Sequence, residues 1–213
     1  MTPPIIKRKT HSEVQRESVG EIIKNILKRD YISLKLVELI IKENAIKEKT
    51  EVNCKLLFRK KKLTIKGEGK GPVDALFSAL VDNFSTEYCS LNNLHFARFS
   101  VEADVEKYLR SSKTDAIVEA TLEIDNDCDA LLFREKSISI SFVSAKVVLA
   151  AIEHFINAEK CVTMLYNNIQ NTKKRNRGDM TNIYTQQLAE IVKNISYENV
   201  IQKLKERQKD ESN

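Results

Sequence analysis

Apolar residues recur with helical spacing near the start of the chain. Five of them follow the i, i+3, i+4, i+7, i+8 pattern of one helix face: Val19, Ile22, Ile23, Ile26 and Leu27. This pattern predicts an amphipathic helix, whose apolar stripe must pack on the rest of the protein. Residues 1–16 are polar and include two early prolines, so we expect a loosely ordered entry to that helix.

Three strands are predicted next. Residues 34–42 satisfy a helical stripe nearly as well as a buried strand, and their β-branched side chains favour the strand. Residues 51–59 alternate between apolar and polar side chains, as a half-buried strand does. Residues 60–62 are predicted to turn, and Leu63 and Ile65 form a short return strand.

The run Gly67-Glu68-Gly69-Lys70-Gly71-Pro72 ends this third strand. Glycine gives access to unusual backbone angles in a tight turn, and proline suits the first turn of a helix. A helix is therefore expected to begin at Pro72. Its core face has a regular apolar spacing: Val73, Leu76, Phe77, Leu80, Val81 and Phe84. Three strands and a covering helix make a βββα unit.

The same order of elements recurs further along the chain. Strands are predicted through residues 94–101, 118–124 and 138–142, followed by an apolar helix over about residues 143–158. A shift of 70 positions places Val73-Asp74-Ala75 over Val143-Ser144-Ala145, each at a strand-to-helix junction. The sequence therefore predicts an α+β fold with an internal repeat of two βββα units.

Two flanking regions complete the predicted organisation. A polar, basic linker is expected at residues 171–179, and a later amphipathic helix carries Leu188, Ile191, Val192 and Ile195, with a possible continuation through Ile201 and Leu204. This helix has the pattern of a docking or oligomerising arm. The predicted regions are an N-terminal segment and helix (1–32), a main domain (33–160, with repeats at about 33–88 and 89–160) and a helical extension (161–213).

Composition narrows the possible environments. Hydrophobic residues make up 42% and charged residues 31% of the chain, as in ordinary globular domains. The longest apolar run, residues 147–152, is far shorter than the ~20 residues of a membrane-spanning helix. The start of the chain lacks the pattern of a signal peptide, so we expect a cytoplasmic protein. The four cysteines are widely spaced, which predicts reduced structural thiols.

The glycine-rich run continues into the helix as Pro72-Val73-Asp74-Ala75-Leu76. The whole run resembles the GxGxGPVDAL signature in the regulatory domain of 2-isopropylmalate synthases and the related citramalate synthases. Lys35-Leu36-Val37, Thr50-Glu51-Val52 and Asp115-Ala116 agree with that family in order and spacing. The family's two βββα units coincide with the predicted repeat. Its catalytic barrel is missing from this chain, because a (β/α)₈ barrel takes ~250 residues.

The resemblance implies an effector site in a dimer, because family members hold leucine or isoleucine between two such domains. The residues implied to form that site are Gly67, Gly69, Gly71, Asp74, Ala75, Leu91, Leu94, Asp115, Ala116 and Ser139. The second unit departs from the family pattern. Ser137-Ile138-Ser139 stands where a Gly-x-Ser junction is usual, and no glycine precedes Asp115.

Each candidate residue also has a purely structural interpretation. Glycines before a helix can present N–H groups to a carboxylate, or they can simply form a tight turn. Asp74 lies in the first helical turn, where its carboxylate can cap local N–H groups. Leu91 and Leu94 can equally be core residues.

Three functions remain open from the sequence. The first is a free-standing regulatory or dimerisation domain that binds a branched-chain amino acid, leucine or isoleucine, and modulates a separate 2-isopropylmalate or citramalate synthase chain in branched-chain amino-acid biosynthesis. The second is a protein-interaction module that has lost the effector, which the missing glycines favour. The third is a basic nucleic-acid-binding protein, suggested only by the net charge of +5 and by the basic runs at residues 59–62 and 173–177.

Catalysis by this chain alone is not expected. Its three histidines, His11, His95 and His154, are scattered, and no local motif pairs a nucleophile with a base. The sequence therefore predicts no catalytic residue, no metal and no cofactor.

Overall fold

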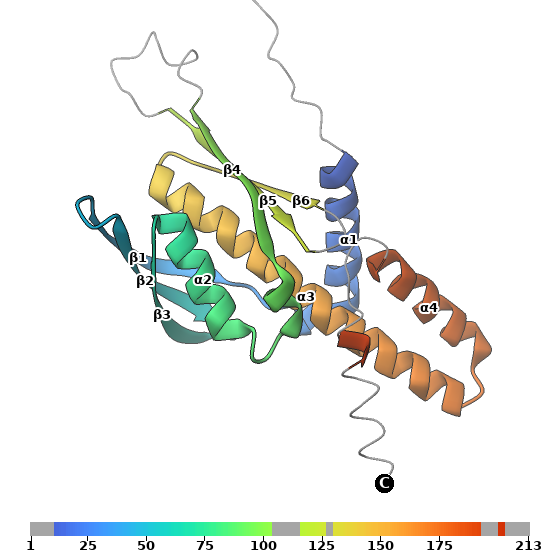
Figure 1. Cartoon of the computed structure of the whole chain (residues 1–213). Helices are drawn as coiled ribbons and strands as arrows, with labels where there is room; N and C mark the ends of the chain where they lie inside the picture. The colour runs from blue at the N-terminus through green and yellow to red at the C-terminus, as the bar shows by residue number, and fades with distance from the viewer. Residues whose placement is uncertain (1–10, 104–115, 127–129, 193–199, 203–213) are drawn as a thin grey trace, which may run out of the picture.

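The structure is a computed structural model that describes residues 11–103, 116–126, 130–192 and 200–202 (Figure 1). Its strands and helices follow the predicted order, which confirms the α+β fold of two βββα units. In chain order they are α1 (His11–Leu27), η1 (Lys28–Asp30), β1 (Lys35–Asn44), β2 (Lys49–Phe58), β3 (Lys61–Gly69), α2 (Pro72–Phe84), η2 (Cys89–Asn93), β4 (His95–Ala103), β5 (Val118–Asp125), β6 (Ala130–Ser137), α3 (Ile140–Lys174) and α4 (Gly178–Val192).

Helix α1 begins earlier than the sequence predicted. The expected loosely ordered entry extended to residue 16, but the helix already starts at His11, and residues 1–10 lie outside the described part. Val19, Ile23 and Leu27 are buried, which confirms the predicted apolar stripe.

The first sheet is antiparallel, with the strand order β1-β2-β3. Along the central strand β2, Val52, Cys54 and Leu56 are buried, whereas Glu51 and Lys55 are exposed, so the predicted alternation is confirmed. The turn after β2 is tighter than expected. It consists of residues 59–60, both with positive φ, and β3 already begins at Lys61.

The second sheet has the order β4-β5-β6, and its central strand buries the four predicted residues of alternating sequence: Val118, Ala120, Leu122 and Ile124. The strand predicted at residues 138–142 is wrong. Strand β6 lies earlier, where Leu131 and Phe133 supply the buried face. Ile140 and Phe142 instead belong to the first turn of α3. Their spacing imitates the alternation of a strand, but they are 60% and 42% exposed and so do not form a buried strand face.

Helix α3 is longer than predicted, at 35 residues. The prediction of a linker at residues 171–179 is wrong. Helix α3 continues to Lys174 and α4 begins at Gly178, so only residues 175–177 connect the two helices. Cys161, Val162 and Leu165 are fully buried, so the apolar face extends well past residue 158. The predicted later helix is α4, in which Ile191 is buried, whereas Ile195 and Leu204 lie outside the described residues.

By length and composition alone, α3 could also cross a membrane. However, 61% of its most apolar window is buried within the protein. This helix therefore has the burial expected of a core helix.

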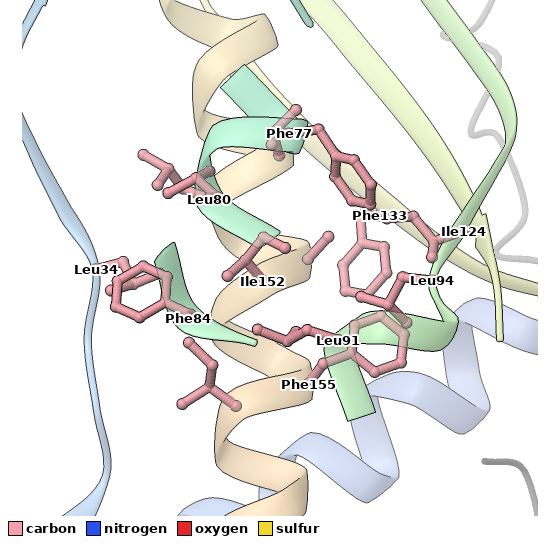
Figure 2. Packing of buried hydrophobic residues seen from close by; sticks show 14 of the residues in the cluster. Leu34, Phe77, Leu80, Phe84, Leu91, Leu94, Ile124, Phe133, Ile152 and Phe155 are labelled. Atoms are coloured by element: carbon pink, nitrogen blue, oxygen red, sulfur yellow. The ribbon is translucent and has the colours of Figure 1, made fainter. Parts of the chain in front are cut away.

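The two units share one hydrophobic core. Helix α2 covers β2 and β3, α3 covers β5 and β6, and the two helices pack on each other, while α1 packs on α3 and β6 (Figure 1). Figure 2 shows Leu80 of α2, Ile152 and Phe155 of α3 and Phe133 of β6 in this core. The helices thus join the two sheets into one folded body.

Polar side chains on α3 hold the connection from α1 to β1. Asn157 is fully buried, accepts the Ile32 N–H at 2.8 Å and donates to the Ile32 carbonyl oxygen at 2.7 Å. Glu153 accepts the Leu34 N–H at 2.7 Å and the Tyr31 hydroxyl at 3.0 Å. Burial, followed by the negative charge of Glu153, raises the pKa of Tyr31, so its hydroxyl remains a donor.

A third polar side chain of α3 holds the connection into the second unit. Glu159 is 8% exposed and accepts the N–H groups of Cys89 at 3.2 Å and Ser90 at 2.9 Å, at the start of η2. A carboxylate at this position satisfies backbone donors that would otherwise be buried without partners.

Candidate functional site

The strand-to-helix junction of the first unit carries most of the predicted effector residues. Gly67 and Gly69 are not in a loop but at the end of β3, directly beneath α2. A Cβ atom on Gly67 would lie 2.4 Å from the Ala79 Cβ and 2.5 Å from the Ala75 carbonyl oxygen. The expectation that these glycines supply unusual backbone angles is wrong, since no described glycine has a positive φ. They are required because the helix approaches the strand so closely.

The N-terminus of α2 is open. Gly71 is its N-cap residue and has no side-chain cap, and a Cβ atom on Gly71 would meet nothing within 4 Å. Asp74 does not cap the helix, because its Oδ2 atom accepts the N–H of Lys70, which precedes the helix, at 3.1 Å. Asp74 thus stabilises the turn that precedes α2, and Gly71 supplies no side-chain cap to the first helical turn.

The equivalent junction of the second unit is closed by a serine. Ser139 is the N-cap residue of α3, and its Oγ atom accepts the Phe142 N–H at 3.3 Å. Ala116, another predicted site residue, is half-buried just before β5, and Asp115 lies outside the described residues. The two units therefore differ at the N-cap of their covering helix, which is Gly71 in the first unit and Ser139 in the second.

The remaining predicted site residues lie in the core. Leu91 is fully buried, Leu94 is 6% exposed, and both pack near Phe155 (Figure 2). Ala75 of α2 is also fully buried, packed against Gly67 and Gly69 of β3. The structure thus places Gly67, Gly69, Gly71, Asp74 and Ala75 together and places Leu91 and Leu94 elsewhere.

Exposed apolar residues occur where β5 begins and where β6 leads into α3. Val118 pairs with Ser137 in the sheet. Ile117 precedes Val118 and Ile138 follows Ser137, so both residues lie beyond the same end of these two paired strands. They are 46% and 72% exposed, and Ile140 and Phe142 follow on the first turn of α3. These four residues form what we call the apolar end of the second unit. Such a surface is typical of a protein–protein interface.

In the part of the chain that the structure describes, the cysteines and histidines show no arrangement for catalysis or metal binding. Cys54 and Cys161 are buried thiols, the Cys89 thiol donates to Glu159 Oε1 at 3.5 Å, and Cys128 lies outside the described residues. Burial raises the pKa of the Cys54 thiol to about 11 and that of Cys161 to about 12, which suppresses the reactive thiolate. Over the described residues, no three His, Cys, Asp or Glu side chains come together as a metal site.

His154 is instead a structural residue. Its ring lies 5.6 Å from that of Phe133 and 5.5 Å from that of Phe155, and its Nε2 atom is buried without a hydrogen-bond partner. Burial, together with the charge of Arg16, lowers the pKa of His154 to about 3. The imidazole is therefore neutral near pH 7.

The family model of the LeuA allosteric (dimerisation) domain matches residues 13–158. This match runs from α1 to the middle of α3 and includes both βββα units. The chain belongs to the LeuA allosteric domain family. A search of curated proteins finds no match.

Membership in the LeuA allosteric domain family supports a regulatory role in LeuA-type synthases, and the match is to the regulatory domain alone. The second half of α3 and helix α4 lie beyond the matched residues. They form an addition to the family domain, and the basic run at residues 173–177 lies at the turn between these two helices.

Sequence reasoning missed a second group of polar residues at the opposite end of α2. The Arg59 Nη2 atom donates to Glu87 Oε1 and to the Tyr88 hydroxyl, both at 2.7 Å. These side chains border a cavity of about 480 Å³ against α3. In the sequence, Arg59 stands out only as part of a basic run, because its partners Glu87 and Tyr88 lie 28 and 29 residues away and no local pattern links them to it.

Proposed function

We propose that this chain is a free-standing regulatory and dimerisation domain that binds leucine or isoleucine and modulates a separate 2-isopropylmalate or citramalate synthase chain in the cytoplasm. The observation that carries the effector proposal is the open N-terminus of α2. Gly71 leaves space for a ligand there, and the helix offers free N–H groups and a positive dipole end to an amino-acid carboxylate.

The regulatory mechanism we propose is linkage between ligand binding and dimer arrangement. If the amino acid binds one arrangement more tightly, it increases the population of that arrangement and the synthase activity that the arrangement supports. The size of the effect is limited by the difference between the two affinities. We infer that the apolar end of the second unit is the dimer surface. It exposes Ile138, Ile140 and Phe142, which a second copy of the chain would remove from water.

The sharpest test changes Gly71 to aspartate. The new carboxylate would cap α2 and repel the effector carboxylate, and the site has room for the side chain. We expect Gly71→Asp to fold with unchanged or higher stability and to lose amino-acid binding in isothermal titration calorimetry. The matched control is Gly178→Asp at the start of α4, where a Cβ atom also meets nothing within 4 Å. If both variants lost binding equally, or if both kept it, the effector would not bind at the N-terminus of α2.

A second candidate function is an interaction module without an effector. Ser139 favours the interaction module, because its side chain caps the N-terminus of α3, whereas the N-terminus of α2 has no side-chain cap. The two functions differ in one measurement. Both predict a dimer, but only the regulatory domain changes the activity of an added synthase barrel when leucine or isoleucine is supplied.

A further inference from the structure

A cavity lies beside Arg59, at the end of α2 opposite to Gly71. It is bounded by the β2–β3 turn, by residues 86–89 after α2 and by α3, with Val200 as a further wall. Its volume of about 480 Å³ lies in the range of small-molecule sites, which is roughly 300–1,000 Å³. Helix α2 has 13 residues and so spans ~20 Å. The cavity therefore lies far from the open N-terminus of α2.

One face of α3 lines the cavity. Lys160, Thr163, Met164 and Asn167 follow helical spacing, and all four border the open space. Thr163 and Asn167 make no side-chain hydrogen bond with any residue that the structure describes, so both polar groups are available to a ligand. Met164 adds a flexible apolar surface between them.

The acidic groups at the cavity are already engaged. Glu87 is paired with Arg59 at 2.7 Å, and Glu159 accepts the N–H groups of Cys89 and Ser90. Lys160 differs from them. Its ammonium donates to the backbone carbonyl oxygen of Asp30, and it forms no salt bridge with the residues that the structure describes.

Arg59 is held in place beside this lysine. Its guanidinium is fixed by Glu87 and Tyr88 and lies 4.9 Å from the centre of the Phe58 ring, while its backbone adopts a positive φ of 49°. Burial, followed by the charge of Arg59, lowers the pKa of Lys160, although Asp30 and Glu87 oppose this more weakly. A bound anion would relieve this repulsion.

We propose that the cavity binds a small organic carboxylate, whose charged group lies between Arg59 and Lys160 and whose carbon chain lies along Met164. Thr163 and Asn167 then offer hydrogen bonds at the rim. Such a ligand would touch the turn of the first unit and the long helix of the second at once. It would therefore stabilise the contact between the two units.

The test uses the ¹⁵N-labelled full chain and three probes in nuclear magnetic resonance titrations: butyrate, n-butylamine and inorganic phosphate. We expect butyrate, up to tens of millimolar, to shift the amide resonances of residues 86–89 and 160–168 saturably, and n-butylamine to leave them unchanged. Lys160→Gln should weaken butyrate binding at least tenfold. The control Lys173→Gln, on the exposed end of the same helix, should not change it.

Three results would overturn the proposal. The first is that butyrate does not shift these amide resonances. The second is that the Lys160→Gln variant binds butyrate as tightly as the original chain does. The third is that phosphate binds to the cavity and butyrate does not. The effector proposed for the N-terminus of α2 would shift residues 67–74 instead. The two sites can therefore fail or succeed independently.

Discussion

At the scale of single residues, the glycine run has a different role from the one its sequence suggests. A Cβ atom on Gly67 would clash with Ala79 and Ala75, and one on Gly69 would lie 2.6 Å from the Asp74 Oδ2 atom. Of the three glycines in this run, Gly71 alone has open space at its Cβ position. Two glycines thus allow α2 to pack on β3, and the third keeps the helix N-terminus accessible.

Replacing Gly67 by alanine should destabilise the protein by about 1–3 kcal/mol, because the added methyl group must displace the backbone of α2. Urea unfolding followed by circular dichroism measures this change. Gly20→Ala is the control, because Gly20 lies within α1 with nothing near its Cβ position, and alanine there should stabilise by about 0.5–1 kcal/mol. Two changes of the same sign would contradict the packing role of Gly67.

His154 should make the protein sensitive to acid. Its pKa is about 3 in the folded state, against 6.5 for an ordinary histidine, so the unfolded chain takes up the proton first as the pH falls. The contribution of this residue to stability is therefore complete above pH 6.5 and is lost between that pH and about 3. The loss is at most about 1.4 kcal/mol per pH unit for one proton.

Urea unfolding at pH 7 and pH 5 compares the original chain with His154→Gln. The variant should lose less stability between these two pH values, because it has no buried imidazole to protonate. If His154→Gln kept the full pH dependence of the original chain, another group would be responsible.

Among the helices and strands, the sequence predicted the ones that have a regular buried face. Strand β5 alternates Val118, Ala120, Leu122 and Ile124, and all four are at most 5% exposed. The prediction failed at β6, because the alternating residues after it are exposed and follow the strand. Periodicity shows which side chains share a face, but it does not show whether that face is covered.

Helix α3 also joins the fold through contacts that no local pattern reveals. Asn157 and Ile32 are hydrogen-bonded although 125 positions separate them. The only hint in the sequence is a polar residue on the apolar face of the helix, which must find a partner when it is buried.

Asn157→Ala should destabilise the protein by about 2 kcal/mol or more, because it leaves both backbone groups of Ile32 buried without partners. Hydrogen–deuterium exchange should show faster exchange of the Ile32 amide. Asn171→Ala, at an exposed position of the same helix, is the control and should change neither quantity. Unchanged protection of the Ile32 amide in Asn157→Ala would show that the Asn157 side chain does not hold this backbone segment.

At the scale of the whole molecule, two units pack their helices together and leave one end of the second unit apolar. If this apolar end is the dimer surface, Ile140→Ser should weaken the dimer at least tenfold in sedimentation equilibrium while the fold is kept. Ile46→Ser is the control, because Ile46 is 96% exposed on the β1–β2 hairpin. Equal dimerisation of both variants would place the interface elsewhere.

The candidate effector site was predictable only in part. Gly67 to Ala75 are neighbours in sequence and remain together in the fold. Leu91 and Leu94 were carried over from the family resemblance, and the structure buries them because their η2 segment fills the core between the units. The cavity at Arg59 could not be predicted, since its walls come from separate segments.

We propose above all that this LeuA allosteric domain binds a branched-chain amino acid. Isothermal titration calorimetry of the full chain with leucine, isoleucine and valine tests it most directly, with thermal unfolding as a parallel measure because a ligand of the folded state raises apparent stability. We predict saturable heat and a higher unfolding temperature with leucine or isoleucine. No heat and no thermal shift with any of the three at millimolar concentration would contradict the claim and favour the interaction module.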